Sequence, residues 1–163
     1  MPQIDDYVQI LEESLIRKSE LLDKIITKNQ AQTDCVEGKE YDDIDWDAFN
    51  LLMAEKEAAI DRINKMDEGF QSLYDRVKEQ LKADKSKYAS NIKRMQELIR
   101  KISDQSVMIQ TGEERNRQTI EKVMMGRKKQ IRHTRNSMKV ASSYAQTMQR
   151  TFLADANEFE KKK

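Results

Sequence analysis

Residues 49–81 read FNLLMAEKEAAIDRINKMDEGFQSLYDRVKEQL, and their apolar positions recur every three or four residues. This spacing places the apolar side chains along one side of an α-helix, with charged side chains on the other. The apolar positions are Phe49, Leu52, Met53, Ile60, Ile63, Met66, Phe70, Leu73, Tyr74, Val77 and Leu81. A helix with one wet face must bury its other face against a partner, so this stretch predicts helix packing.

The composition of the chain agrees with this prediction. Of its 163 residues 36% are charged, only four are glycine and one is proline, which is typical of helical bundles and coiled coils. The 30 basic and 29 acidic residues give a net charge of +1, so no long-range field draws the molecule to nucleic acid or anionic lipid. We expect no membrane insertion and a cytoplasmic location, because the apolar runs are short and Cys35 has no cysteine partner.

The same periodicity continues on both sides of residues 49–81. We expect an all-α fold, an antiparallel, coiled-coil-like bundle of three long helices over residues 4–35, 47–82 and 86–125. Lys18 interrupts the apolar stripe of the first helix. Between Gln110 and Thr119 the third helix has Gly112, Glu113 and Asn116 where apolar residues are expected, so the bundle should be thin or ended there.

An acidic stretch separates the first two helices. Residues 37–47 hold six carboxylates and a single lysine, and Gly38 offers a helix end, so this is a connecting loop. Asp47 is placed to cap the second helix, and Trp46 to fold back on Leu51 as a hydrophobic staple. The acidic loop is either a solvated turn or a docking point for the basic segment described next.

A C-terminal segment, residues 126–163, differs in character from the bundle of residues 1–125. Six cations and no acid occur within residues 127–139, and an amphipathic stripe follows. The stripe consists of Ala141, Tyr144, Ala145, Met148, Phe152 and Phe159. Such a stripe either recognises a helix of a partner or packs back on the first two helices of its own chain.

The inventory of reactive groups argues against an enzyme. There is one histidine, His133, and one cysteine, and no carboxylate pair has an apolar pocket to tune it, so we expect no catalytic residue, metal or cofactor. The residues are also compatible with two other functions. One is a structural or scaffolding coiled coil, and the other is a helical nucleic-acid binder that uses the basic segment 127–139.

Several stretches together resemble one protein family. They are the leading amphipathic helix, the acidic break, Trp46-Asp47-Ala48-Phe49-Asn50-Leu51-Leu52 running into Glu55-Lys56-Glu57-Ala58-Ala59-Ile60, and Glu113-Glu114-Arg115-Asn116 in the third helix. This order is similar to the FlgN family of bacterial flagellar type III export chaperones. The C-terminal run from Gly126-Arg127-Lys128-Lys129 to Ser142-Ser143-Tyr144 resembles the tails of some members.

The resemblance implies a cytosolic chaperone that keeps hook-filament junction proteins apart and delivers them to the flagellar export gate or its ATPase complex. In that family the client binds the C-terminal helical region, which corresponds here to Ala141, Tyr144, Ala145, Met148 and Phe152. Tyr144 is also the candidate for an export-gate contact, although this chain lacks the glycine-rich tail that can follow such a tyrosine. Without a client we expect the C-terminal segment to be mobile or swapped between two chains of a homodimer.

Overall fold

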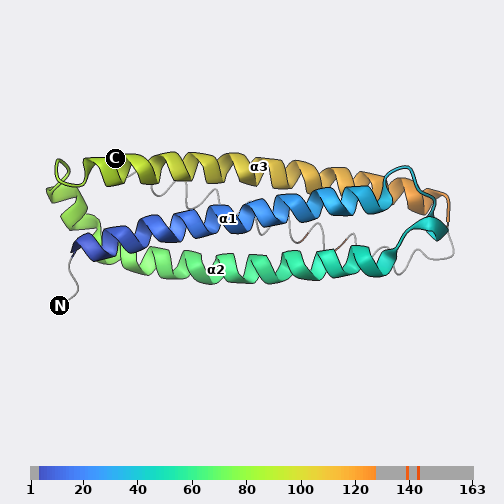
Figure 1. Ribbon diagram of the computed structural model, residues 1–163, viewed down its shortest axis with the longest axis horizontal. Helices are drawn as coiled ribbons and strands as arrows, with labels where there is room; N and C mark the ends of the chain where they lie inside the picture. Colours follow the sequence, from blue (N-terminus) through green and yellow to red (C-terminus); the bar gives the residue numbers. More distant parts are fainter. Residues whose placement is uncertain (1–3, 128–138, 140–142, 144–163) are drawn as a thin grey trace.

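The computed structural model describes residues 4–127, 139 and 143 and shows a bundle of long helices (Figure 1). Helix α1 spans Ile4–Val36, α2 spans Trp46–Ala83 and α3 spans Ala89–Met125, and the 3-10 turn η1 (Tyr41–Asp43) lies between α1 and α2. No strand occurs in the part of the chain that the structure describes. The expected all-α helical bundle is confirmed, and the ends of the three helices fall close to the predicted residues.

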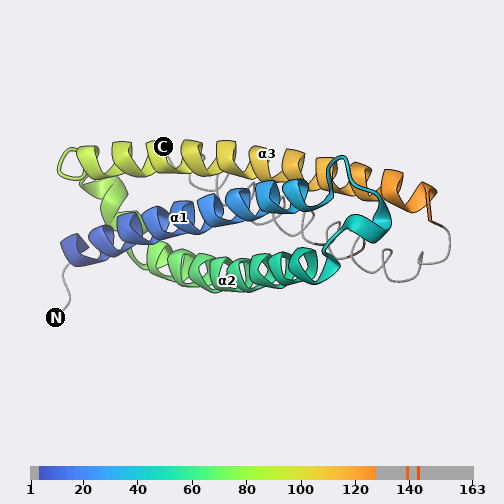
Figure 2. The ribbon, with the colours of Figure 1, turned by 45° about the vertical axis from the view of Figure 1, so that its right-hand side comes forward.

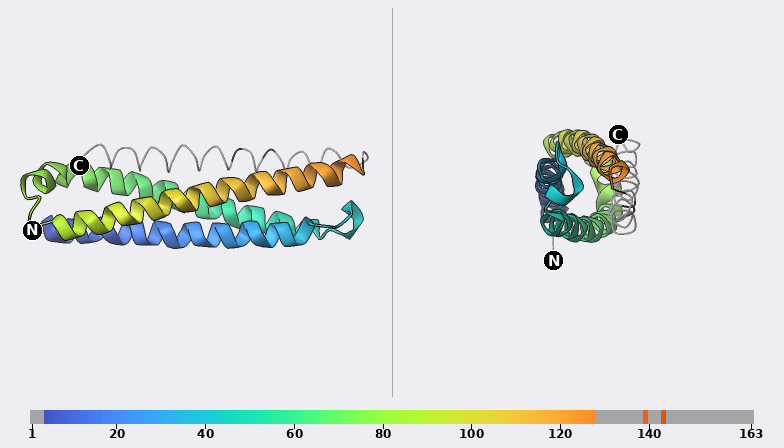
Figure 3. Two further views of the ribbon diagram at one scale, coloured as in Figure 1. Left: turned by 90° about the horizontal axis from the view of Figure 1, so that it is seen from above. Right: turned by 90° about the vertical axis from the view of Figure 1, so that its right-hand side faces the viewer.

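Helix α1 is the central element of the arrangement. It packs against both α2 and α3, whereas α2 and α3 make no comparable contact with each other. Seen along the bundle, α3 and α2 lie on either side of α1, and the side view shows α1 between them (Figures 2 and 3). The chain runs up α1, back along α2 and up α3, so α1 and α3 are parallel and α2 is antiparallel to both.

Two adjacent residues of α1 set the alignment of its two neighbours. Lys18 forms an ion pair with Asp67 of α2 at 2.7 Å, with only 3% of the lysine side chain exposed. The Ser19 hydroxyl donates to Oε1 of Gln105 in α3 at 2.9 Å. The lysine that interrupts the apolar stripe therefore contributes a polar contact between helices, and its aliphatic stem allows it to be buried there.

Most of the buried apolar side chains form one continuous apolar core. It extends from the start of α1 to the middle of α3, and it follows the periodic positions of the sequence. Its members include Val8, Leu11, Leu15, Leu22, Ile25, Ile60, Ile63, Tyr74, Val77, Met95, Ile99, Ile102 and Ile109. The stripe of residues 49–81 is thus buried largely against α1, as its spacing predicts.

The connection between α1 and α2 corrects two sequence predictions. The side chain of Asp45, rather than that of Asp47, caps α2 by accepting a hydrogen bond from the backbone N–H of Ala48 at 3.0 Å. The Trp46 ring packs against Tyr41 and Phe49, and 61% of Leu51 is exposed, so the predicted staple with Leu51 is wrong. The cause is that η1 brings the Tyr41 ring under the indole, whose N–H donates to the Tyr41 carbonyl at 3.2 Å.

The connection between α2 and α3 is held against the first turn of α1. Helix α3 begins at Ala89 rather than near residue 86, because the backbone N–H groups of Lys87 and Tyr88 turn back to the Asp84 carbonyl. Tyr88 is buried, and its hydroxyl donates to Oδ1 of Asp5 at 2.7 Å. This hydrogen bond holds the pKa of Asp5 below its ordinary value.

The region of α3 between Gln110 and Thr119, where the bundle is expected to be thin or ended, is buried instead. Glu113 and Asn116 are 2% and 1% exposed, and Ile120 beyond them is fully buried. Ile120 belongs to a second, smaller apolar group, the end cluster, which consists of Val36, Ile44, Phe49, Met53 and Ile120. The bundle therefore continues to the end of α3, and the polar residues of this stretch face the interior because they have polar partners on α1 and α2.

Candidate functional site

Two parts of the bundle depart from simple apolar packing. One is a group of buried polar side chains between the apolar core and the end cluster. The other is the side of the bundle between α2 and α3, which have far fewer contacts with each other than with α1, and it is called here the α2–α3 face. The chemistry of the first decides whether it can be reactive, and the geometry of the second decides whether it can hold a helix.

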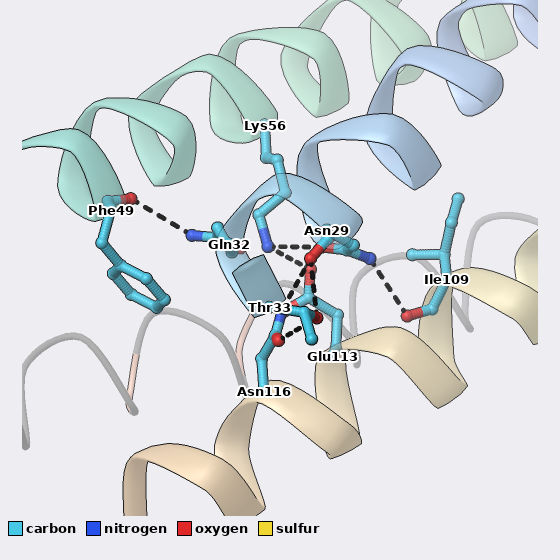
Figure 4. Close-up of polar contacts among 8 residues, drawn as sticks. All are labelled: Asn29, Gln32, Thr33, Phe49, Lys56, Ile109, Glu113 and Asn116. Carbon is cyan, nitrogen blue, oxygen red and sulfur yellow. Dashed lines mark hydrogen bonds and ion pairs between the residues drawn. The ribbon is translucent and has the colours of Figure 1, made fainter. Parts of the chain in front are cut away.

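The first group, the polar layer, draws on all three helices (Figure 4). It consists of Asn29, Gln32 and Thr33 of α1, Lys56 of α2, and Glu113 and Asn116 of α3. All six are at most 4% exposed. They meet because helical spacing turns each of them inward at the same level of the bundle.

The Lys56 ammonium is the centre of the polar layer. It forms an ion pair with Oε1 of Glu113 and donates a hydrogen bond to Oδ1 of Asn29 at 2.7 Å. Burial lowers the pKa of Lys56 and raises that of Glu113, while the attraction between the two charges opposes both shifts. The pair replaces the water that both groups lose, at a site where an unpaired charge would be costly.

The amide and hydroxyl groups around this pair extend the polar layer to α3. The Thr33 hydroxyl lies 2.7 Å from Oδ1 of Asn116, and Nδ2 of Asn116 donates to the Asn29 carbonyl at 3.2 Å. Nδ2 of Asn29 donates to the Ile109 carbonyl at 3.4 Å. Each of these bonds joins α1 to α3, so the polar layer fixes how far the two parallel helices can slide along each other.

Gly112 explains how Asn29 can approach α3 so closely. A Cβ atom at position 112 would lie 3.1 Å from Nδ2 of Asn29, which is tighter than ordinary van der Waals contact. Gly112, which interrupts the apolar stripe of the sequence, therefore leaves room for the amide of Asn29 because it has no side chain.

The polar layer is not an active site. Lys56 is 0% exposed, so no substrate reaches its amine, and its carboxylate partner is buried with it. Within residues 4–127, 139 and 143, no three histidine, cysteine, aspartate or glutamate side chains gather in a way that could hold a metal ion. Sequence reasoning missed this layer, although the polar residues at stripe positions in both α1 and α3 were its signal.

The α2–α3 face lies over α1 in the middle of the bundle. Leu15 and Lys18 of α1, Phe70 of α2 and Ile99 of α3 all line one cavity of about 10 Å³, which shows that the three helices converge there. The Phe70 ring stacks on Tyr74 with the centroids 6.3 Å apart, and Phe70 itself is only half-buried. Helices α2 and α3 have far fewer contacts with each other than either has with α1.

The end of α3 lies beside the acidic loop. Arg127, the first cation of the basic segment, forms an ion pair with Asp42 of η1. A surface hollow of about 400 Å³ is lined there by Tyr41, Lys122 and Arg127 among others. The acidic loop thus contacts the beginning of the basic segment, which was one of the two alternatives for this loop.

Most residues predicted to bind a client lie outside the described part of the chain. Ala141, Tyr144, Ala145, Met148 and Phe152 are all among them, as is His133. Two residues close to the stripe are described. Lys139 and Ser143 are both helical and exposed.

Comparison with protein-family models, with curated proteins and with solved structures finds no match for this chain. None of the described helices combines the length and the apolar character that crossing a membrane requires.

Proposed function

We propose that this chain is a cytoplasmic export chaperone that binds flagellar hook-filament junction proteins, prevents their premature association and delivers them to the type III export apparatus. The bound form would be a mixed helical bundle in which an apolar stripe of the client is covered. Neither a nucleotide nor a metal takes part in this mechanism. The client contacts are assigned to Ala141, Tyr144, Ala145, Met148 and Phe152, with Tyr144 also as the candidate for the export-gate contact.

The observation that carries the proposal is the α2–α3 face. Helix α1 packs along both α2 and α3, whereas α2 and α3 have far fewer contacts with each other, although Lys56 and Glu113 join them in the polar layer. We propose that a client helix docks on the side where α2 and α3 are less closely packed. Helix-in-groove recognition uses such an apolar face and anchors at spacings of three and four. Flagellar junction proteins with helical ends need this kind of cover, because exposed apolar stripes associate.

Contact between two of the stretches that resemble the FlgN family also supports the proposal. Lys56 belongs to the run Glu55-Lys56-Glu57, and Glu113 to the run Glu113-Glu114-Arg115-Asn116. The two residues form the buried ion pair of the polar layer. A shared polar residue pattern of this kind would keep one bundle geometry among related chains, which an apolar stripe alone does not specify.

A binding measurement with the full chain and a purified junction protein tests the proposal. The triple variant Tyr144→Ser, Met148→Ser, Phe152→Ser removes three apolar anchors, each worth about 1.5–3 kcal/mol when buried, so affinity should fall at least about 100-fold. The matched control Lys139→Ser, Arg150→Ser changes the other helical face and should bind as the native chain does. If the triple variant bound with the affinity of the native chain, the assigned client site would be wrong. If the native chain did not bind the junction protein, the proposed function would be wrong.

Two further measurements separate the chaperone proposal from the two alternative functions. Salt dependence tests nucleic-acid binding, and light scattering tests a scaffolding coiled coil. A nucleic-acid binder that uses residues 127–139 should lose affinity for DNA or RNA by about 10³-fold or more between 50 and 200 mM salt, as multiple phosphate contacts do. A chaperone that covers an apolar stripe should bind its client almost equally at both. A scaffolding coiled coil should form large assemblies, whereas the chaperone should stay a monomer or homodimer in light scattering.

A further inference from the structure

A surface hollow lies between α1 and α2, which run side by side (Figure 1). It has a volume of about 590 Å³ and its lining residues all belong to these two helices, so it is called here the α1–α2 groove. On α1 they extend from Ile10 to Lys24, which is about 21 Å of helix, and on α2 from Arg62 to Met66. The α1 wall alone is as long as about four turns of a further helix laid beside it.

Cations dominate the α1–α2 groove. Two come from each helix: Arg17 and Lys24 from α1, and Arg62 and Lys65 from α2. All four are exposed, and within the described part of the chain none of them forms an ion pair. Two less exposed lysines of α1 do pair with α2, Lys18 with Asp67 and Lys28 with Glu55. The groove therefore gathers like charges from two helices, and an anionic occupant relieves their repulsion.

The α1 wall of the groove has the seven-residue repeat of a helix-binding surface. Ile10, Arg17 and Lys24 follow each other at intervals of seven, and so do Glu13 and Glu20. Side chains at this interval form rows along a helix, and charged rows of this kind flank the seam of a coiled coil and select its partner. Because the two glutamates balance only two of the four cations, the groove favours a helix with acidic rows.

Apolar side chains lie among these charges. Ile10 is 49% exposed, Met66 is half-buried and Leu21 is buried. Among the described residues that line the groove, none is aromatic. Single-stranded nucleic acid stacks its bases on aromatic side chains, whereas a helix with an apolar stripe covers residues such as Ile10 and Met66. The groove therefore has the chemistry of a protein-binding surface.

Gly69 leaves the α2 wall low beside the groove. It follows Met66 by three residues, Lys65 by four and Arg62 by seven, so helical spacing places it on the same side of α2. A Cβ atom there would meet no atom within 4 Å, so the packing of its own chain does not require a glycine. Glycine is unfavourable inside a helix, and its use is to let another backbone approach closely.

We infer that the α1–α2 groove binds an acidic amphipathic helix of a partner protein. Carboxylates seven residues apart on that helix pair with Arg17 and Lys24, which are about 10.5 Å apart along α1. Its apolar side chains cover Ile10 and Met66, and its backbone passes over Gly69. This surface is separate from the C-terminal stripe assigned to the client, so the inference does not rest on the chaperone proposal.

A binding measurement with a synthetic peptide and the full-length chain tests the inference. The probe is a three-heptad peptide with leucine at the two seam positions, glutamate beside them, and alanine and glutamine elsewhere. Its binding is followed by fluorescence anisotropy at about 150 mM salt, which screens unspecific attraction. Arg17→Glu combined with Arg62→Glu should weaken binding at least about tenfold, and a peptide with lysine in place of glutamate should bind this variant better than it binds the native chain.

The matched control changes the same net charge elsewhere. Lys93→Glu combined with Arg100→Glu alters two exposed cations of α3, also seven residues apart, and should leave peptide binding unchanged. Circular dichroism checks that both double variants keep their helicity. Gly69→Gln should weaken binding without lowering the stability of the free chain, because it fills the open side of α2 with a better helix former.

Each outcome decides the inference. Weaker binding of the acidic peptide by the groove variant alone, with recovery by the lysine peptide, supports it. Equal binding of a scrambled acidic peptide overturns it, because charge without an apolar stripe would then suffice, and so does absence of binding or equal loss in the α3 control. Tighter groove binding of single-stranded DNA or of anionic vesicles overturns it in favour of those partners. The Tyr144→Ser, Met148→Ser, Phe152→Ser variant should bind the acidic peptide as the native chain does, and a loss there would place the peptide on the client stripe and overturn the inference.

Discussion

The apolar core and the polar layer hold the same three helices together by different chemistry. In the apolar core, side chains such as Ile63 and Met95 pack through non-directional contacts that depend on volume and burial. In the polar layer, Lys56, Glu113 and Asn29 have specific partners at hydrogen-bond distance. A helix that slides by one turn can still bury apolar side chains, but it loses every hydrogen bond of the polar layer. We therefore expect the apolar core to supply most of the free energy of folding and the polar layer to fix the alignment of the helices.

The largest expected effect comes from removing one half of the buried ion pair. Lys56→Met leaves Glu113 buried without its counter-charge, which should lower the free energy of unfolding by about 3–5 kcal/mol. Lys28→Met is the matched control, because Lys28 also pairs across α1 and α2, with Glu55, but with 27% and 41% of the two side chains exposed. That change should cost at most about 1 kcal/mol. Urea unfolding followed by circular dichroism measures both.

A second substitution tests whether the loss comes from the unpaired charge. Lys56→Met combined with Glu113→Leu removes both charges and should recover most of the stability lost in Lys56→Met. If the double variant were as unstable as the single one, packing around Lys56 rather than the ion pair would be the cause.

A comparable or slightly smaller loss is expected in the apolar core. Ile63 is fully buried, and Ile63→Ala should lower the free energy of unfolding by about 2–5 kcal/mol through lost burial and the cavity left behind. Ile63→Val should cost only about 0.5–1.5 kcal/mol. Neither change involves a titrating group, so both losses should be the same at pH 5 and pH 7. A loss that varied with pH would show that the two regions are coupled.

The polar layer should respond to pH where the apolar core does not. Burial holds the pKa of Glu113 in the folded chain above its value in the unfolded chain. At a pH below the unfolded pKa the carboxyl is protonated in both states, so its burial carries no charge penalty. As the pH rises above the unfolded pKa, the folded state becomes less stable because this charge has to be buried. Lys56→Met removes the opposing attraction, which raises this pKa further. The stability difference between Lys56→Met and the native chain should therefore be smaller near pH 5 than at pH 7. Urea titrations at both pH values measure it, and a difference independent of pH would exclude an ionised Glu113 as its source.

The smallest changes in stability are expected from substituting two helical glycines, one with open space around it and one packed against another helix. A Cβ at Gly69 on α2 would meet no atom within 4 Å, so Gly69→Ala should raise stability by about 0.5–1 kcal/mol through helix propensity. At Gly112 the same Cβ would press on Nδ2 of Asn29 at 3.1 Å, so Gly112→Ala should gain less or lose stability. Thermal unfolding of the two variants side by side measures the contrast. Equal gains would show that Asn29 moves aside freely and that the polar layer is loosely held.

The sequence alone determined where the helices lie and which stripe each one buries, because periodicity and helix-ending residues are local properties of the chain. It therefore predicted the bundle of α1, α2 and α3 and the contribution of residues such as Ile63 and Val77 to the core. The stripe at Tyr144, Met148 and Phe152 stays a sequence prediction, since those residues lie outside the described part of the chain.

Only the tertiary structure decided the meaning of the polar residues inside the stripes. Lys18, Gly112, Glu113 and Asn116 read as interruptions in one helix at a time. The last three led to the expectation that the bundle is thin or ended between Gln110 and Thr119, which is wrong. Their partners are distant in sequence: Lys56 lies 57 residues from Glu113, and Asn29 lies 27 residues from Lys56. A buried charge is favourable only when an opposite charge from another helix reaches it, and periodicity within a single helix carries no information about that partner.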